Sequence, residues 1–285
     1  KFPSLGNQDF IYKGNIANWK KFANGLKARY IMRTSFINED FDGVISFANK
    51  AFASASEQAQ LTYNGTTMIS PFYKFFTDRN YFGASQSLYN KLEERNDPRI
   101  DVLWKPAAGT SEVEIAPNGN PVQVQGRYGV SAISVPTAPT YLLSYHEIEF
   151  LKAEAYVRKG DLGSAEASLR KAVTAALSKS NIGLASKAAE YLDNEVLPRF
   201  NSNPLAEVMN QKYLAFYEEE AIEAYCDYRR LLAMNDDVIK LDNPKNAAGE
   251  FPHRLTYGNS DVTTNINVRN AYGDGRYVYT EKVCL

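Results

Sequence analysis

Residues 141–180 contain apolar side chains at intervals of three and four, which is the spacing of one face of an α-helix. In YHEIEFLKAEAYVRK, the first part of the segment, this spacing places Ile148, Leu151 and Ala155 on one face. The spacing resumes after Gly160, a residue suited to ending a helix. We therefore predict two short helices joined by a tight turn.

Small and aromatic residues place this hairpin in the register of a tetratricopeptide repeat (TPR). Ala153 takes the small position of the first helix and Tyr156 the aromatic position, while Ala165 and Ala172 lie on the second helix. Residues 14–56 predict a similar hairpin with a longer turn. A solenoid normally needs about three adjacent repeats, and here about eighty residues separate the two hairpins. We therefore expect the hairpins to act as a scaffold.

The remaining chain divides by composition. Glycine and proline punctuate residues 61–140, which predicts a loop-rich insertion with one helix before Pro98 and a short strand in VQVQGRYGV. Residues 205–233 have the pattern of one long helix, and residues 240–285 predict an irregular C-terminal segment. The expected fold class is mainly α, with TPR-like helical hairpins and long loop-rich insertions.

The overall composition disfavours several classes of function. Lys and Arg number 32 against 33 acidic residues, so we expect no nucleic-acid partner. No apolar run approaches the ~18 residues of a membrane-spanning helix. Cys226 and Cys284 form no CxxC pair, and they could be two thiols or one disulfide. The N-terminus, KFPSLGNQDF, lacks the features of a signal peptide. We expect the chain to have been cut from a longer protein.

The insertion concentrates aromatic rings beside polar side chains, notably in TDRNYFG (77–83). Flat rings stack on the C–H faces of sugars, while amide, carboxylate and guanidinium groups hydrogen-bond their hydroxyls. The alternative is that the aromatic residues pin the loop to the hairpins, which is how we interpret Trp104. The predicted ligand-binding residues are Tyr73, Asp78, Arg79, Asn80, Tyr81 and Tyr128.

A run of acidic residues raises the alternative of a glycoside hydrolase, which needs a pair of carboxyl groups. The run comprises Glu218, Glu219, Glu220, Glu223 and Asp227. Glu219, Glu223 and Asp227 lie at successive one-turn intervals on the predicted helix, which is more typical of a solvated or ion-paired helix face. We therefore expect no catalytic residues.

Two further motifs resemble metal sites without completing them. His146-Glu147 begins like the zinc-protease motif, but residue 150 is Phe where the second His is required. Residues 270–281 match several positions of a calcium-binding EF-hand loop, but Tyr272 occupies a ligand position. A tight Asp-Gly turn between extended segments fits this stretch better. We expect neither a metal nor a cofactor.

Five segments in this order resemble the C-terminal part of the SusD/RagB family. They are NWKKFANGLKARYIMR (18–33), NDPRI (96–100), SYHEIEFLKAEAYVRKGD (144–161), QKYLAFYEEEAIEAYCDYRRL (211–231) and FPHRLTY (251–257). The resemblance spans nearly the whole chain, which begins near the family's third hairpin.

The resemblance implies a SusD-like α/α superhelix and a function. Members of this family are surface lipoproteins of the Bacteroidetes outer membrane that bind oligosaccharides or other small nutrients. They act as a lid on a SusC-like TonB-dependent transporter. The resemblance thus implies carbohydrate binding and nutrient uptake without catalysis, with an N-terminal lipid anchor that is absent from this chain. A TPR-like scaffold that binds peptides or proteins is the alternative function.

Overall fold

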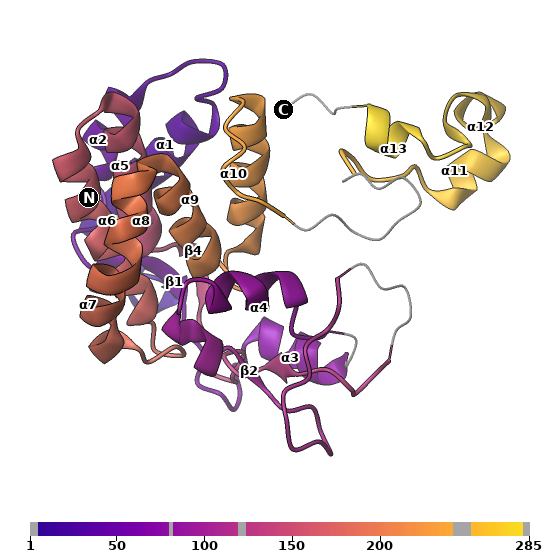
Figure 1. Ribbon diagram of the computed structural model, residues 1–285, viewed down its shortest axis with the longest axis horizontal. Helices are drawn as coiled ribbons and strands as arrows, with labels where there is room; N and C mark the ends of the chain where they lie inside the picture. Colours follow the sequence, from indigo (N-terminus) through magenta and orange to yellow (C-terminus); the bar gives the residue numbers. More distant parts are fainter. Residues whose placement is uncertain (1–4, 80–81, 119–123, 242–251, 282–285) are drawn as a thin grey trace.

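The computed structural model describes residues 5–79, 82–118, 124–241 and 252–281, and these are mostly helical (Figure 1). The predicted fold class is confirmed. The helical body consists of α1 (Ile16–Arg33), α2 (Phe41–Ala48), α5 (Tyr145–Lys159), α6 (Leu162–Leu177), α7 (Ala188–Tyr191), α8 (Leu197–Ser202), α9 (Pro204–Ala215) and α10 (Ala221–Ala233).

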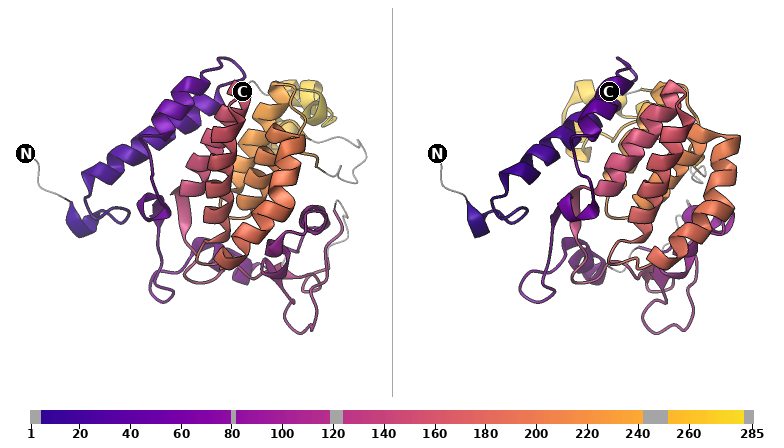
Figure 2. Two further views of the ribbon diagram at one scale, coloured as in Figure 1. Left: turned by 60° about the vertical axis from the view of Figure 1, so that its left-hand side comes forward. Right: turned by 90° about the vertical axis from the view of Figure 1, so that its left-hand side faces the viewer.

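The insertion lies at one end of the helical body in Figures 1 and 2. It contains two helices, α3 (Pro71–Asp78) and α4 (Gln86–Glu93). One antiparallel strand pair lies at its two ends, and a second lies inside it. The outer pair joins β1 (Ala59–Leu61) to β4 (Thr140–Leu143), and the inner pair joins β2 (Trp104–Lys105) to β3 (Val130–Ser131).

The predicted hairpin forms α5 and α6, and a side chain caps the start of each helix. The Ser144 hydroxyl accepts a hydrogen bond from the Glu147 amide, and the Asp161 carboxylate accepts one from the Ser164 amide. Gly160 ends α5 with a φ of 79°, a left-handed conformation that glycine adopts without steric cost. This turn brings the apolar faces of the two helices together.

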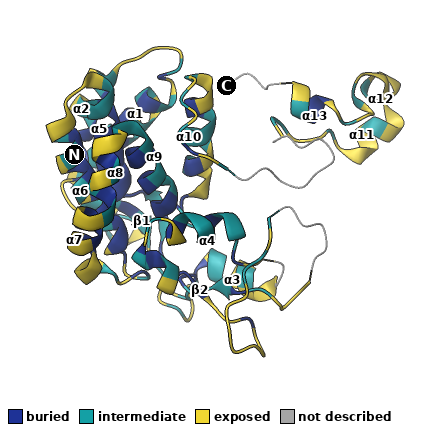
Figure 3. Cartoon of the chain, viewed as in Figure 1, coloured by how far each residue is buried: buried dark blue, intermediate teal, exposed yellow. Residues whose placement is uncertain are grey.

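The core of the body lies where α5 packs against α6, α2 and α9 (Figure 3). Ala153, Ala165 and Ala172 are fully buried at these contacts, because small residues let the helices approach closely. The first hairpin, α1 and α2, packs on the other side of α5. Its second helix ends at Ala48, earlier than the apolar spacing predicts.

The prediction of one long helix over 205–233 is wrong. The helix breaks between α9 and α10, where Glu218 has a φ of 67°. A continuous helix would point consecutive side chains about 100° apart, whereas the turn lets three successive carboxylates reach buried polar groups. These contacts join Glu218 to Ser131, Glu219 to Lys179, and Glu220 to His146.

Two further predictions hold only in part. Of VQVQGRYGV, only Val130 lies in a strand, and its first two residues lie outside the described part of the chain. The C-terminal segment is not irregular throughout, because it forms α11 (Asn259–Thr264), α12 (Ile266–Tyr272) and α13 (Tyr277–Thr280). The Asp274-Gly275 turn therefore joins two helices, and the rings of Tyr257, Tyr272 and Tyr277 pack together beside it.

Candidate functional site

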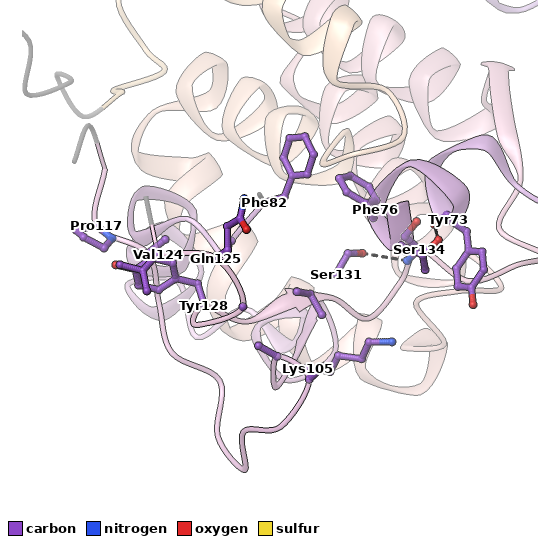
Figure 4. Close-up of a pocket in the computed structure, with 17 residues that line it drawn as sticks. Tyr73, Phe76, Phe82, Lys105, Pro117, Val124, Gln125, Tyr128, Ser131 and Ser134 are labelled. Carbon is purple, nitrogen blue, oxygen red and sulfur yellow. Dashed lines mark hydrogen bonds between the residues drawn. The ribbon is translucent and has the colours of Figure 1, made fainter. Parts of the chain in front are cut away.

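The insertion contains a pocket of about 450 Å³, and all of the residues that line it lie between residues 73 and 134 (Figure 4). α3, β2, β3 and the loops between them contribute its walls. The described lining combines aromatic, small apolar and uncharged polar side chains, and Lys105 is its one charged residue among the described ones. The principal ones are Tyr73, Phe76, Phe82, Lys105, Gln125, Tyr128, Ser131 and Ser134.

One wall of the pocket is a cluster of phenylalanine rings. The Phe76 and Phe82 ring centroids lie 5.1 Å apart in an edge-to-face arrangement, and Phe75 packs against both. Phe75 and Phe82 remain about half exposed. The rings thus support one another while leaving apolar surface open, which suits stacking against a ligand.

Tyr128 lies on another side of the pocket (Figure 4). A Cβ atom on Gly83 would lie only 2.7 Å from the Tyr128 Cβ, so the absence of a side chain at Gly83 lets Tyr128 approach. The guanidinium of Arg127 lies over the Tyr128 ring at 5.5 Å, and Arg127 also pairs with Glu114. These neighbours fix the loop that carries the ring.

The serine hydroxyls of the pocket connect it to the turn between α9 and α10. Ser131 Oγ donates a hydrogen bond of 2.8 Å to Glu218 and accepts one of 3.0 Å from the Ser134 amide. Burial raises the pKa of Glu218 to about 7, and the charge of Glu219 adds to this, although Ser131 and Lys179 favour the ionised form. Ser131 and Ser134, which we call the floor of the pocket, are therefore linked by hydrogen bonds to a carboxyl group whose pKa lies near neutral pH.

The same turn and the neighbouring helices hold the rest of the insertion. The Trp104 indole N–H donates to the Tyr217 hydroxyl at 3.0 Å, and the ring is buried, so Trp104 packs as predicted. In the NDPRI segment, Arg99 and Asp97 form a buried ion pair that Gln211 of α9 joins at 2.9 Å. These contacts fix the pocket to the scaffold.

The structure brings two of the predicted ligand residues together. Tyr73 and Tyr128 line the pocket, with Tyr73 at its edge in Figure 4. Asp78 and Arg79 lie at the end of α3, exposed and outside the pocket lining. Asn80 and Tyr81 lie outside the described residues. Ligand contact by these six residues stays a prediction.

Sequence reasoning missed several lining residues. Phe76 could have been found, because it follows Tyr73 by three residues and shares its face of α3. Lys105 and Ser131 carry no such signal. They reach the same pocket only because β2 pairs with β3 across 24 intervening residues.

The acidic residues of α10 form ion pairs, as one of the sequence interpretations predicts. Glu223 pairs with Arg33, and Asp227 pairs with Lys212 at 2.7 Å and Arg230 at 3.0 Å. In the described part of the chain, no group of three or more His, Cys, Asp or Glu side chains is placed to hold a metal ion.

Of the two cysteines, Cys226 is a half-buried thiol, and Cys284 lies outside the described residues. No helix among the described residues has the length and apolar character needed to cross a membrane.

The comparisons with known proteins agree with this architecture. A family model described as "Starch-binding associating with outer membrane" matches residues 2–258. The chain belongs to the SusD/RagB family. No curated protein matches this SusD-like chain.

Solved structures of the family share the fold. A SusD/RagB family protein from Bacteroides thetaiotaomicron is 40% identical, with a TM-score of 0.86 over 99% of this chain and 67% of that one. A chitin-binding SusD homologue from Flavobacterium johnsoniae is 20% identical, with a TM-score of 0.72 over 96% of this chain and 64% of that one. The SusD-like chain thus spans about two thirds of their length.

Proposed function

We propose that this chain binds an oligosaccharide in the insertion pocket. The observation that carries the proposal is the pocket itself, which combines exposed aromatic rings with hydroxyl, amide and amine groups. A volume of about 450 Å³ falls in the range of small-molecule sites. The Phe76–Phe82 wall offers apolar surface to sugar rings, while Gln125 and Ser131 offer hydrogen bonds to hydroxyls.

The comparisons support a glycan over other nutrients. The family model is described as starch-binding, and the Flavobacterium johnsoniae homologue is described as chitin-binding. Recognition without hydrolysis fits the lining, because none of the described residues that line the pocket is Asp, Glu or His. Association with the outer membrane and delivery of the glycan to a SusC-like TonB-dependent transporter complete the proposed function.

Calorimetry with chito- and malto-oligosaccharides tests glycan binding. We expect at least one series to bind, and Phe76→Ala and Phe82→Ala each to lower its affinity about two- to twelvefold, because one stacked ring contributes about 0.5–1.5 kcal/mol. Phe10→Ala is a matched control, since Phe10 is an exposed ring outside the pocket. The proposal is wrong if neither series binds, or if all three variants bind as the parent does.

The transporter step has its own test. We expect the full-length protein, isolated from native outer membranes in mild detergent, to co-purify with a TonB-dependent transporter. Recovery without such a transporter would contradict delivery and leave the glycan site to be judged by calorimetry.

A further inference from the structure

Three buried polar atoms converge on one small cavity beneath the pocket floor. Ser70 Oγ, Ser134 Oγ and Glu218 Oε1 are buried, and none has a hydrogen-bond partner among the described residues. All three residues line a cavity of about 10 Å³. A buried polar group without a partner costs about 1–3 kcal/mol, so three around one cavity need an explanation.

The size and polarity of the cavity match one water molecule. A buried water needs roughly 10–15 Å³ and two to four polar partners. Two hydroxyls and a carboxyl oxygen supply suitable donors and acceptors. The rest of the lining is apolar, including Phe72 and Ile133, apart from Glu219, whose carboxylate already pairs with Lys179. A cavity of about 10 Å³ leaves no room for a group larger than a water molecule.

We propose that Glu218, together with one water molecule bound between it, Ser70 and Ser134, positions the floor of the insertion pocket. This inference rests on the proposed glycan function where it concerns binding, but the water site itself does not. The two oxygens of Glu218 have separate roles. Oε2 accepts the Ser131 hydroxyl at 2.8 Å, and Oε1 faces the water. The link joins the α9–α10 turn to the start of α3 and to the loop after β3.

The backbone supports a dedicated role for this side chain. Glu218 has a φ of 67°, which is uncommon for a residue with a side chain and costs about 1 kcal/mol or more. Strain of this kind persists where surrounding contacts over-determine it. Here the conformation is what carries the carboxyl group to Ser131 while Glu219 pairs with Lys179 at 2.8 Å.

The protonation of Glu218 then controls what Ser131 offers to a ligand. When Glu218 is ionised, the Ser131 hydroxyl donates to it and presents only a lone pair to the pocket, because the Ser134 amide uses the other. When Glu218 is protonated, its carboxyl O–H can donate to Ser131 Oγ, and the Ser131 hydroxyl is then free to donate a hydrogen bond to a ligand. A ligand that covers the floor also excludes water, which further disfavours the charged carboxylate.

The charged groups around Glu218 determine the pH at which it gains or loses its proton. Glu219 on the same turn disfavours ionisation, Lys179 after α6 favours it, and the neutral hydroxyl of Tyr217 lies beside them on the turn. With the pKa of Glu218 near 7, glycan affinity should fall as the pH rises through neutrality. A ligand-induced rise of one pKa unit corresponds to about a tenfold change.

The water site is tested without any ligand. If the water is bound, Ser70→Ala removes one of its partners and lowers the urea midpoint. If the cavity is dry, the same change deletes an unpaired hydroxyl, and the midpoint stays or rises, which would overturn the water. A high-resolution crystal structure should show one ordered water in contact with Ser70, Ser134 and Glu218.

The role of the carboxyl group is tested by infrared titration and by calorimetry. The infrared spectrum of the parent should contain a protonated carboxyl band that disappears as the pH rises through about 7, and Glu218→Gln should lack this band. Glu195→Gln, which alters a surface ion pair, should retain the band. Parent affinity for the bound oligosaccharide should fall several-fold from about pH 6 to about pH 8, and Glu218→Gln should abolish this dependence.

A missing carboxyl band, or the same pH profile in both proteins, would overturn the role of Glu218. If no oligosaccharide binds at any pH, the proposed glycan function fails, while the urea and infrared measurements still decide this inference.

Discussion

Replacing Glu154 by Gln removes the charge that Arg230 faces in the core of the helical body. Glu154 lies on α5 and Arg230 on α10, and both side chains are almost completely buried. Two hydrogen bonds of 2.7 Å join them in a bidentate pair, and Arg158 adds a third contact to Glu154 at 2.8 Å. Removing the Glu154 charge leaves Asp227, at 3.0 Å, as the carboxylate that still faces Arg230, so the buried guanidinium is only partly compensated.

The size of the loss follows from the pKa of Glu154. Burial alone would raise this pKa, but the charges of Arg230 and Arg158 outweigh burial and lower it from 4.5 to about 2. At about 1.4 kcal/mol per pKa unit, the difference corresponds to about 3 kcal/mol of folding free energy. Because the pKa is lowered on folding, this stability is present above pH 4.5 and is lost as the pH falls towards 2.

Urea denaturation of the parent and Glu154→Gln, repeated from neutral to acid pH, measures this contribution. We expect the variant to be less stable by about 3 kcal/mol at neutral pH, and the gap to close below pH 4.5. Glu166→Gln is the matched control. Its ion pair with Arg170 is well exposed, so the change should cost less than about 1 kcal/mol. A Glu154→Gln variant as stable as the control, or a gap that ignores pH, would refute the reasoning.

Three further changes test the packing of the scaffold, each by urea denaturation. Gly160→Ala should cost about 1 kcal/mol, because a φ of 79° strains any residue with a Cβ atom; no loss would contradict this turn. Gly25→Ala should cost about 1–3 kcal/mol, since its Cβ would lie 2.4 Å from Leu143 Cδ2, and an unchanged midpoint would show that Leu143 moves aside. Trp104→Phe should cost about 1 kcal/mol by removing the hydrogen bond to Tyr217, whereas a more stable variant would count against that bond.

The hairpin scaffold could be predicted from the sequence because its signals are local. Apolar spacing marks the faces of α5 and α6, Ser144 and Asp161 cap their starts, and Gly160 ends the first helix. All of these residues lie within one stretch of the chain, so a pattern of a few residues specifies each feature.

The break between α9 and α10 could not be predicted, because its causes are distant in sequence. Glu218 bonds to Ser131, 87 residues away, and Glu220 bonds to His146, 74 residues away. Local preference favours a continuous helix through an acidic run, and tertiary contacts override it. For the same reason, only some of the pocket residues could be predicted from the sequence. Tyr128 stands out by composition, whereas Ser131 joins the site only through strand pairing.

Residues of the α9–α10 turn and residues of the phenylalanine wall therefore differ in how strongly folding constrains them. Tyr217 and Glu218 bind the insertion through hydrogen bonds with Trp104 and Ser131, whereas the ring contacts of Phe75, Phe76 and Phe82 join described residues within the insertion. We therefore expect substitutions in the phenylalanine wall to affect the proposed glycan binding more than folding. Substitutions in the turn act on both, because they remove the partners of buried polar groups as well as the support of the pocket.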